Sequence, residues 1–220
     1  MATPRGKIPE AAIRRLPVYL RELADMHRAG VTVTSSADLA ERTGFTSEQI
    51  RKDLAYFGAF GTRGVGYDTK GLADAIRKIL RLRTLVPVAM IGAGNLGLAF
   101  TRYSRQQHKD VRITAVFDVD PQKVGQMVMD LRIQSMNDLE RVIAAQGTKL
   151  AVLAVPSEVA QIIVDRLAAS GIEAILNFTP VKLKVDHVHI QDIDITMELM
   201  SLAYFTSEIQ PDPQRFGEGF

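Results

Sequence analysis

Apolar residues near the start of the chain recur at helical spacing. The intervals of three and four residues place their side chains on one face of a helix. The residues on this face are Ile13, Leu16, Leu20 and Leu23. The pattern predicts an amphipathic helix that ends near Gly30, and Pro17 is expected to kink this helix or to delay its start.

Two shorter helices are expected next, each introduced by a capping sequence. Thr34-Ser35-Ser36 precedes a helix predicted over 37–43, with Gly44 as its stop. Thr46-Ser-Glu-Gln49 has the spacing of a capping box and predicts a third helix from 47 to about 57. A helix, a short turn and a second helix form the helix-turn-helix pattern of DNA-binding proteins.

The third predicted helix has two different faces. Ile50, Leu54 and Phe57 fall on one side and are expected in the core. Because Arg and Lys donate hydrogen bonds to guanine edges and phosphates, the other side predicts DNA contact. The DNA-binding candidates are Arg51 and Lys52 on that side and Ser47 at the start of the helix. A solvated helix face is the alternative.

A glycine-rich segment, 57–67, follows this helix and predicts a tight hairpin, or wing. Arg63 is expected at or near its tip, placed to enter a minor groove. A plain glycine-rich turn with an exposed arginine is the alternative. A helix predicted over 69–82 then leads to the second half of the chain.

The second half alternates strand and helix patterns, which predicts a doubly wound parallel sheet. The strands are expected at 86–91, 111–117, 150–155, 172–177 and 188–193, and the helices at 96–107, 137–146 and 158–170. The pattern over 121–135 is ambiguous. We therefore expect an α/β protein with a winged-helix domain over 1–80 and a Rossmann-like domain over 81–195.

A dinucleotide fingerprint lies between the first of these strands and its helix. The residues that would hold a pyrophosphate at the helix N-terminus are Gly92, Ala93, Gly94, Asn95, Leu96 and Gly97. Asp118 ends the next predicted strand, 21 residues after Gly97. Its carboxylate is expected to accept from the adenosine ribose hydroxyls, which favours NAD(H) over the phosphorylated cofactor. A purely structural glycine-rich turn is the alternative.

The last predicted helix, over 196–207, is apolar on almost every side, with Glu198 and Ser201 as a thin polar stripe. Such a helix is expected to be buried between domains or subunits. We therefore expect residues 196–220 to form a segment distinct from the two domains, with a disordered tail from Gln210.

Charge and composition narrow the function. Residues 1–85 carry 15 Lys and Arg against 9 Asp and Glu, whereas residues 86–220 carry 12 against 16. This asymmetry predicts a polyanionic partner for the N-terminal part. The chain has no cysteine, which excludes disulfides and thiol redox chemistry. It has no signal peptide and no membrane-spanning run, so a cytoplasmic location is expected.

Catalytic groups and metal ligands are not evident in the sequence. His187 and His189 fall on one face of a predicted strand, but a third metal ligand is not apparent, and solvent-facing histidines are the simpler interpretation. Tyr103 is the one candidate proton donor near the nucleotide. The nucleotide is therefore expected to be sensed rather than consumed.

Several segments together resemble the Rex family of bacterial redox-sensing transcriptional repressors, over about residues 7–205. They are Lys7-Ile-Pro9, Arg15-Leu-Pro-Val-Tyr-Leu-Arg21, Ser35-Ser36, Ile50-Arg-Lys-Asp-Leu-Ala-Tyr-Phe-Gly58, Gly61-Thr-Arg-Gly-Val-Gly-Tyr67, 91–97, Phe117-Asp118, Leu176-Asn-Phe-Thr-Pro180 and Ile193-Asp-Ile-Thr-Met-Glu-Leu199. The segment 126–130 departs from the resemblance, because a more glycine-containing loop is expected there.

The resemblance implies a homodimer whose subunits exchange a C-terminal helix. It implies binding to palindromic operator DNA when NADH is low and release when NADH rises. Tyr103 and Phe178 would border the nicotinamide of NADH or NAD⁺. Arg21 and Asp194 would form a switch between the DNA-binding domain, the cofactor domain and the partner's helix.

Two other functions remain open at this point. The first is an NAD-dependent oxidoreductase with a basic N-terminal cap. The second is a winged-helix protein that binds coenzyme A. Asp118 argues against the second, because its carboxylate would repel an adenosine 3′-phosphate.

Overall fold

A computed structural model describes residues 8–62, 64–107 and 110–206. The chain divides into two compact units, one up to Thr84 and one from Leu85. Each unit is described below by itself. Arg63 and the tail from residue 207, both subjects of sequence predictions, lie outside the described residues.

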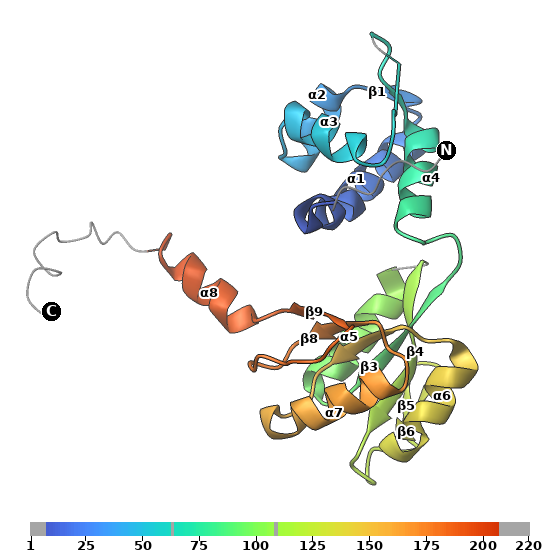
Figure 1. Cartoon of the computed structure of the whole chain (residues 1–220), viewed down its shortest axis with the longest axis vertical. Helices are drawn as coiled ribbons and strands as arrows, with labels where there is room; N and C mark the ends of the chain where they lie inside the picture. The colour runs from blue at the N-terminus through green and yellow to red at the C-terminus, as the bar shows by residue number, and fades with distance from the viewer. Residues whose placement is uncertain (1–7, 63, 108–109, 207–220) are drawn as a thin grey trace, which may run out of the picture. The chain divides into compact units, whose positions relative to one another are not determined.

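The first unit is a small helical domain with a two-stranded sheet (Figure 1). Its elements are α1 (Glu10–Arg28), β1 (Val33–Thr34), α2 (Ser36–Thr43), α3 (Ser47–Ala55), β2 (Tyr67–Asp68) and α4 (Thr69–Ile79). β1 and β2 pair antiparallel, and a bridge between Thr62 and Gly66 closes the hairpin above β2. The order and the hairpin are those of a winged helix, as the sequence predicted.

α1 begins at Glu10 and continues through Pro17, so the predicted delay of its start is wrong. Proline inside a helix costs about 3 kcal/mol. Burial of one face against the other helices offsets this cost, since most helical stability in proteins comes from tertiary packing. The buried residues of α1 are Ala12, Leu16, Tyr19, Leu20, Leu23 and Met26.

α3 and α4 both end earlier than predicted, for local reasons. After α3, the amides of Tyr56 and Phe57 donate to carbonyls three residues back, which tightens the last turn. After α4, Arg81 adopts a left-handed backbone with φ of 60°. The amide of Leu82 then donates to the carbonyl of Arg77, which closes a Schellman motif.

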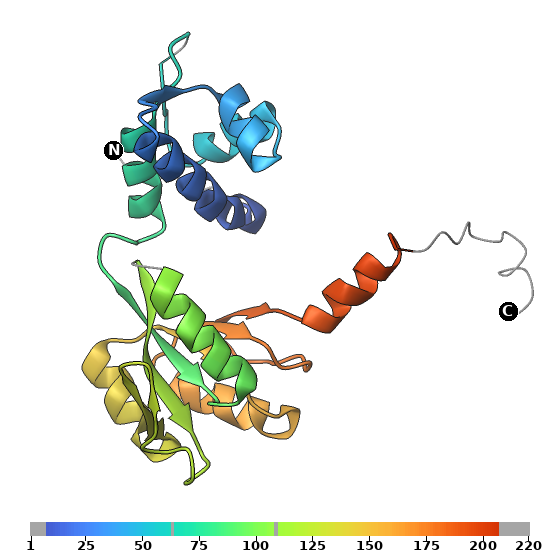
Figure 2. The ribbon, with the colours of Figure 1, turned by 180° about the vertical axis from the view of Figure 1, so that it is seen from behind.

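The second unit is a seven-stranded sheet between helices (Figures 1 and 2). Its elements are β3 (Val86–Ile91), α5 (Asn95–Gln107), β4 (Val111–Asp118), β5 (Met127–Val128), β6 (Leu131–Ser135), η1 (Met136–Asp138), α6 (Leu139–Gln146), β7 (Leu150–Leu153), α7 (Ser157–Ala169), β8 (Ala174–Asn177), β9 (His189–Asp192) and α8 (Ile195–Ala203). The strand order is β5-β6-β4-β3-β7-β8-β9, and every pair except β5 with β6 is parallel. This is the predicted doubly wound arrangement.

Alternate residues of β3 face the two sides of the sheet. Ala89 and Ile91 pack with residues of α6 and α7, whereas Val88 and Met90 pack with residues of α5. Figure 1 accordingly shows α6 and α7 on one face, and Figure 2 shows α5 on the other. The sheet is covered on both faces, which explains why its strands are almost continuously apolar.

The segment that the sequence left ambiguous forms the hairpin of β5 and β6. Val128 pairs with Leu131, so Met129 and Asp130 form a two-residue turn. Met129 has φ of 53°, a conformation that glycine adopts more readily. Arg105 of α5 pairs with the Asp130 carboxylate and so ties the turn to the helix.

The last helix, which was expected to be buried between domains or subunits, is not covered by the described residues of its own chain, so its burial between subunits stays a prediction. Each described residue of α8 is exposed. Its large apolar residues are Ile195, Met197, Leu199, Met200 and Leu202, followed by Tyr204 and Phe205. Within the described ranges, no helix is long and apolar enough to cross a membrane.

Asp53 is a buried carboxylate that joins α3 to α1. Its oxygens accept two hydrogen bonds from the Arg15 guanidinium, at 2.6 and 2.9 Å. They also accept from the Tyr19 hydroxyl at 2.7 Å and from the side-chain amide of Gln49, through Nε2, at 2.8 Å. Gln49 therefore reaches forward to Asp53, and the predicted capping box at Thr46 is formed only on the Thr46 side, by its bond from the Gln49 amide N–H.

The ionised form of Asp53 is strongly favoured despite its burial. Burial alone would raise its pKa, but the donors of Arg15, Tyr19 and Gln49 outweigh that effect and hold the pKa of Asp53 below its ordinary value. The same cluster raises the pKa of Tyr19, chiefly through burial and its bond to Asp53. α3 is thus held on α1 by the charge of Asp53, and protonation of this carboxylate would cost folding free energy.

We expect Asp53→Asn to destabilise the first unit by about 3 kcal/mol, because it leaves the Arg15 guanidinium without its buried partner. Urea unfolding of the full chain, followed by circular dichroism, measures the loss. Hydrogen exchange localises it to α1 and α3. The matched control is Asp25→Asn, which removes an exposed carboxylate paired with Arg28 and should change stability by less than about 1 kcal/mol.

The pH dependence separates this ion pair from simple packing. A lowered folded pKa stabilises the protein fully above the unfolded value of about 3.9, and the stabilisation is lost as the pH falls through the folded pKa. Unfolding at pH 7 and pH 3 should therefore differ less in Asp53→Asn than in the unaltered protein. Equal pH dependence in both would contradict the role of the Asp53 charge.

Candidate nucleotide and DNA sites

The fingerprint turn lies where the strand order reverses direction. β3 is flanked by β4 on one side and β7 on the other, and the chain leaves β3 at the carboxyl edge of the parallel strands. In doubly wound sheets this position is the usual nucleotide crevice. The turn then enters α5, which starts at Asn95, so the helix N-terminus faces the same edge.

The three fingerprint glycines are required for different reasons. Gly92 has φ of 99°, and a Cβ there would overlap the carbonyl oxygen of Ala154 on the neighbouring strand's loop. A Cβ at Gly97 would overlap the carbonyl oxygen of Gly92. A Cβ at Gly94 would meet nothing within 4 Å. Gly92 and Gly97 therefore serve the fold, whereas the space beside Gly94 is open to a ligand.

Asp118 ends β4 beside this turn and is buried. Its Oδ2 accepts from the backbone amide of Ala93 at 2.8 Å, and its Oδ1 accepts from the amide of Asp120 at 2.9 Å. Burial raises the pKa of Asp118, but these two amides and the Lys123 ammonium lower it more, so its pKa lies below the ordinary value. The structure thus brings an ionised acceptor to the fingerprint, as the sequence predicted.

Lys123 is a site residue that sequence reasoning missed. Its Nζ lies 3.4 Å from Asp118 Oδ2 and 3.8 Å from Asp120 Oδ2. The turn after Asp120, whose carbonyl accepts from the amide of Lys123, returns the lysine to the acidic residue. Pro121 and Gly125 around it are the signal that could have indicated such a turn.

Phe178 is held firmly at the carboxyl end of β8. Its ring packs against Phe100 of α5, with centroids 5.7 Å apart. The amide of Phe178 donates to the carbonyl of Leu153, and the buried Asn177 side chain is bonded to Thr179 and to Asp192. Phe178 is therefore a fixed apolar surface two strands from β3.

Tyr103 differs from Phe178 in its surroundings. It lies on α5, and 57% of it is exposed. Its predicted place beside the nicotinamide stays a prediction.

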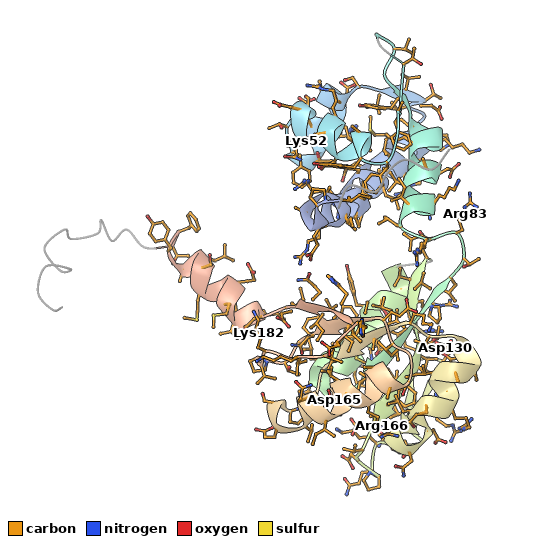
Figure 3. The ribbon with its side chains drawn as sticks, in the orientation of Figure 1. Lys52, Arg83, Asp130, Asp165, Arg166 and Lys182 are labelled. Atoms are coloured by element: carbon orange, nitrogen blue, oxygen red, sulfur yellow. The ribbon has the colours of Figure 1, made fainter. Side chains whose placement is uncertain are left out.

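The DNA-binding candidates lie on and beside α3. Ile50 and Leu54 are buried and Phe57 packs against the same core, as predicted. Arg51 and Lys52 are exposed, and Figure 3 shows Lys52 on the surface of α3. Ser47 is half-buried at the start of the helix.

A groove of about 430 Å³ links α3 to the wing. Arg51 lies in its wall and donates to the Ser36 hydroxyl at the start of α2, at 2.8 Å. The other residues that line it are Ser35, Phe60, Gly61, Thr62, Gly64, Val65, Gly66 and Tyr67. Arg51 of α3 and the residues of the wing therefore line the same groove.

The two switch candidates lie in different units. Arg21 is exposed on α1, and its Nε lies 3.3 Å from Glu22 Oε1. Asp194 caps α8, because its Oδ1 accepts from the amides of Thr196 and Met197. The capping role was not foreseen. A contact between Arg21 and Asp194 stays a prediction.

Metal binding has little support. Among the described residues, no group of three or more His, Cys, Asp or Glu side chains could hold a metal ion. His187 adopts a left-handed backbone with φ of 63°, and His189 begins β9. Two histidines without a third ligand do not make a structural site.

Known protein families match both units. Residues 7–55 match the family described as putative DNA-binding protein N-terminus, and residues 85–181 match the CoA binding domain family. Curated relatives cover nearly the whole chain. The redox-sensing transcriptional repressor Rex of Natranaerobius thermophilus is 43% identical over 93% of this chain and 94% of its own. The Rex protein of Desulfitobacterium hafniense is 46% identical over 90% of this chain and 95% of its own.

Solved structures agree with these relatives. RSP in complex with β-NAD⁺ and operator DNA is 35% identical, with a TM-score of 0.84 over 91% of this chain and 93% of that one. RSP in complex with β-NADH is 34% identical, with a TM-score of 0.79 over 91% and 95%. RSP is a Rex-family repressor. The similarity covers 91% of this chain and therefore extends over both units.

We expect Gly94→Ala to abolish dinucleotide binding without loss of stability, because its Cβ enters open space that the pyrophosphate needs. Gly97→Ala should instead cost about 1–3 kcal/mol of stability, because its Cβ overlaps the Gly92 carbonyl. Urea unfolding and NADH titration of both variants test this pair. Tight NADH binding by Gly94→Ala would show that the nucleotide lies elsewhere.

Proposed function

This chain belongs to the Rex family, and on that premise we propose that it is a transcriptional repressor that senses the ratio of NADH to NAD⁺. It binds operator DNA when NADH is low and releases the DNA when NADH binds. The observation that carries the proposal is the union of two sites in one chain. A winged helix with an outward basic face precedes a fingerprint whose open side lies at Gly94.

DNA recognition falls to the winged-helix domain, for which we propose residues 1–80. In this proposal Ser47, Arg51 and Lys52 contact the major groove, and Arg63, which lies outside the described residues, contacts the minor groove. The Asp53 cluster holds α3 rigidly on α1, so the contacts need little ordering when DNA binds. A two-fold dimer would place two such helices on the half-sites of a palindromic operator.

Nucleotide sensing falls to the Rossmann-like domain, for which we propose residues 81–195. The fingerprint turn would hold the pyrophosphate, and Asp118 would accept from the adenosine ribose. The nucleotide is a ligand and not a substrate in this proposal. The relatives named as transcriptional repressors support that interpretation. For a protein that binds both operator DNA and NADH, we propose a cytoplasmic location.

The difference between NADH and NAD⁺ can be sensed through charge alone. The oxidised nicotinamide is cationic and the reduced ring is neutral. Phe178 and Phe100 form an apolar surface at the carboxyl end of β8, and a cation placed there loses hydration. Only a ligand with different affinity for two conformations can shift their populations, so this discrimination is what drives release.

α8 supplies the link between subunits in this proposal, with residues 196–220 as the exchanged segment. The helix is apolar on several sides and exposed in a single chain. A second copy of the chain would cover it. We propose that Asp194, at its N-terminus, contacts Arg21 in one state of the dimer and not in the other.

We expect Lys52→Ala to lose about 1–3 kcal/mol of specific DNA affinity if the lysine contacts a base edge. Fluorescence anisotropy measures it on a palindromic duplex selected by the protein from random DNA, and on an unrelated duplex. Lys149→Ala is the control, since it removes the same charge from the second unit. Unchanged affinity of folded Lys52→Ala for the selected duplex would contradict the assignment of α3.

We expect NADH, and much less NAD⁺, to release the selected duplex from the unaltered protein. Asp194→Asn should bind NADH normally but release DNA less, because asparagine keeps the helix cap while removing the charge. The measurement is DNA affinity across an NADH titration. Asp194→Ala, which loses both the cap and the charge, separates the two roles.

Two results would count against these proposals. Release by NAD⁺ at the same concentration as NADH would refute charge discrimination. Identical NADH-driven release by Asp194→Asn and the unaltered protein would remove Asp194 from the switch.

A further inference from the structure

Lys123 occupies the acceptor that the adenosine ribose requires. Its Nζ lies 3.4 Å from Asp118 Oδ2, and the amide of Ala93 donates to the same oxygen at 2.8 Å. A carboxylate oxygen offers two lone pairs. Among the described residues, Oδ2 therefore receives two donors, whereas Oδ1 receives only the amide of Asp120, which leaves one of its lone pairs open.

A ribose diol and this lysine compete for the same atom. The diol brings two hydroxyl donors, and Asp118 has one open position. Full recognition of the diol therefore requires Lys123 to move away from Oδ2. The lysine can do so, because 38% of its side chain is exposed and its four-carbon stem is flexible.

A phosphate on the ribose reverses this competition. A phosphate monoester carries a charge of about −1.5 to −2 at pH 7, which Asp118 repels and an ammonium attracts. Lys123 lies on the boundary between the buried carboxylate and solvent, with Asp120 as a second carboxylate 3.8 Å away. It is thus the cation positioned to offset the repulsion from Asp118.

We propose that Lys123 sets how strongly this site rejects adenine nucleotides that carry a phosphate on the adenosine ribose. This inference rests on the proposed nucleotide site. Asp118 alone would exclude such nucleotides, as the sequence suggested, but with Lys123 beside it the site retains measurable affinity for them. The discrimination between NADH and NADPH is then a balance of opposite charges and not the property of one residue.

The test compares NADH with NADPH, which differ only in the 2′-phosphate. Cofactor fluorescence reports both, and the chain has no tryptophan to interfere. We expect Lys123→Gln to increase the ratio of the NADPH Kd to the NADH Kd by about tenfold, which corresponds to about 1.4 kcal/mol. Asp120→Asn should decrease that ratio, because it removes a carboxylate that competes for the lysine.

Lys149→Gln is the matched control. Lys149 pairs with Glu173 and lies at the amino end of β7, whereas Asp118 lies at the carboxyl end of the parallel strand β4. The same loss of charge there should leave the ratio unchanged. A second pair, coenzyme A and dephospho-coenzyme A, tests a 3′-phosphate by displacement of NADH. A Lys123-dependent difference in one pair alone identifies which ribose position the lysine reads.

The outcomes separate this inference from the proposed function. If NADH binds but Lys123→Gln changes the NADH and NADPH affinities equally, or if neither NADPH nor coenzyme A displaces NADH from the unaltered protein, the role of Lys123 is overturned. If NADH itself does not bind to the unaltered protein, the nucleotide site of the proposed function fails first.

Discussion

The orientation of α3, the helix proposed to contact DNA, depends on the charge of Asp53. Asp53 lies on α3, yet two of its partners, Arg15 and Tyr19, lie on α1. A neutral residue of the same size would leave the guanidinium without a counter-charge, so the cluster persists only as a whole. The outward face of α3 is therefore positioned by contacts on the inner side of the helix, where Asp53 and Tyr19 are buried.

Asp118 in the second unit follows the same principle. It is also buried, is also held ionised by donors, and also connects two segments that are distant in the sequence. The difference lies in what remains free. All the acceptors of Asp53 bind groups of the protein. Among the described residues, Asp118 has one lone pair without a donor, and one of its donors, Lys123, can move away. One carboxylate stabilises a fold, and the other is available to a ligand.

The sequence was informative where local pattern and local chemistry agree. The alternation of strand and helix patterns predicted a doubly wound parallel sheet, and the glycine spacing located the turn after β3. It was uninformative where the partner is remote. Asp53 sits between the two faces of its helix and meets residues 34 and 38 positions away. Lys123 reaches Asp118 only through a turn, and Arg81 ends α4 in a conformation that sequence rules assign to glycine.

The exposed helix α8 makes the protein's own abundance part of its physical behaviour. In an exchanged dimer, its apolar surface is covered only by association, so the fraction of chains in the dimeric form follows mass action. Dilution then weakens the operator complex more steeply than a simple one-to-one equilibrium does. The amount of operator complex then depends on two concentrations, that of the nucleotide and that of the chain itself.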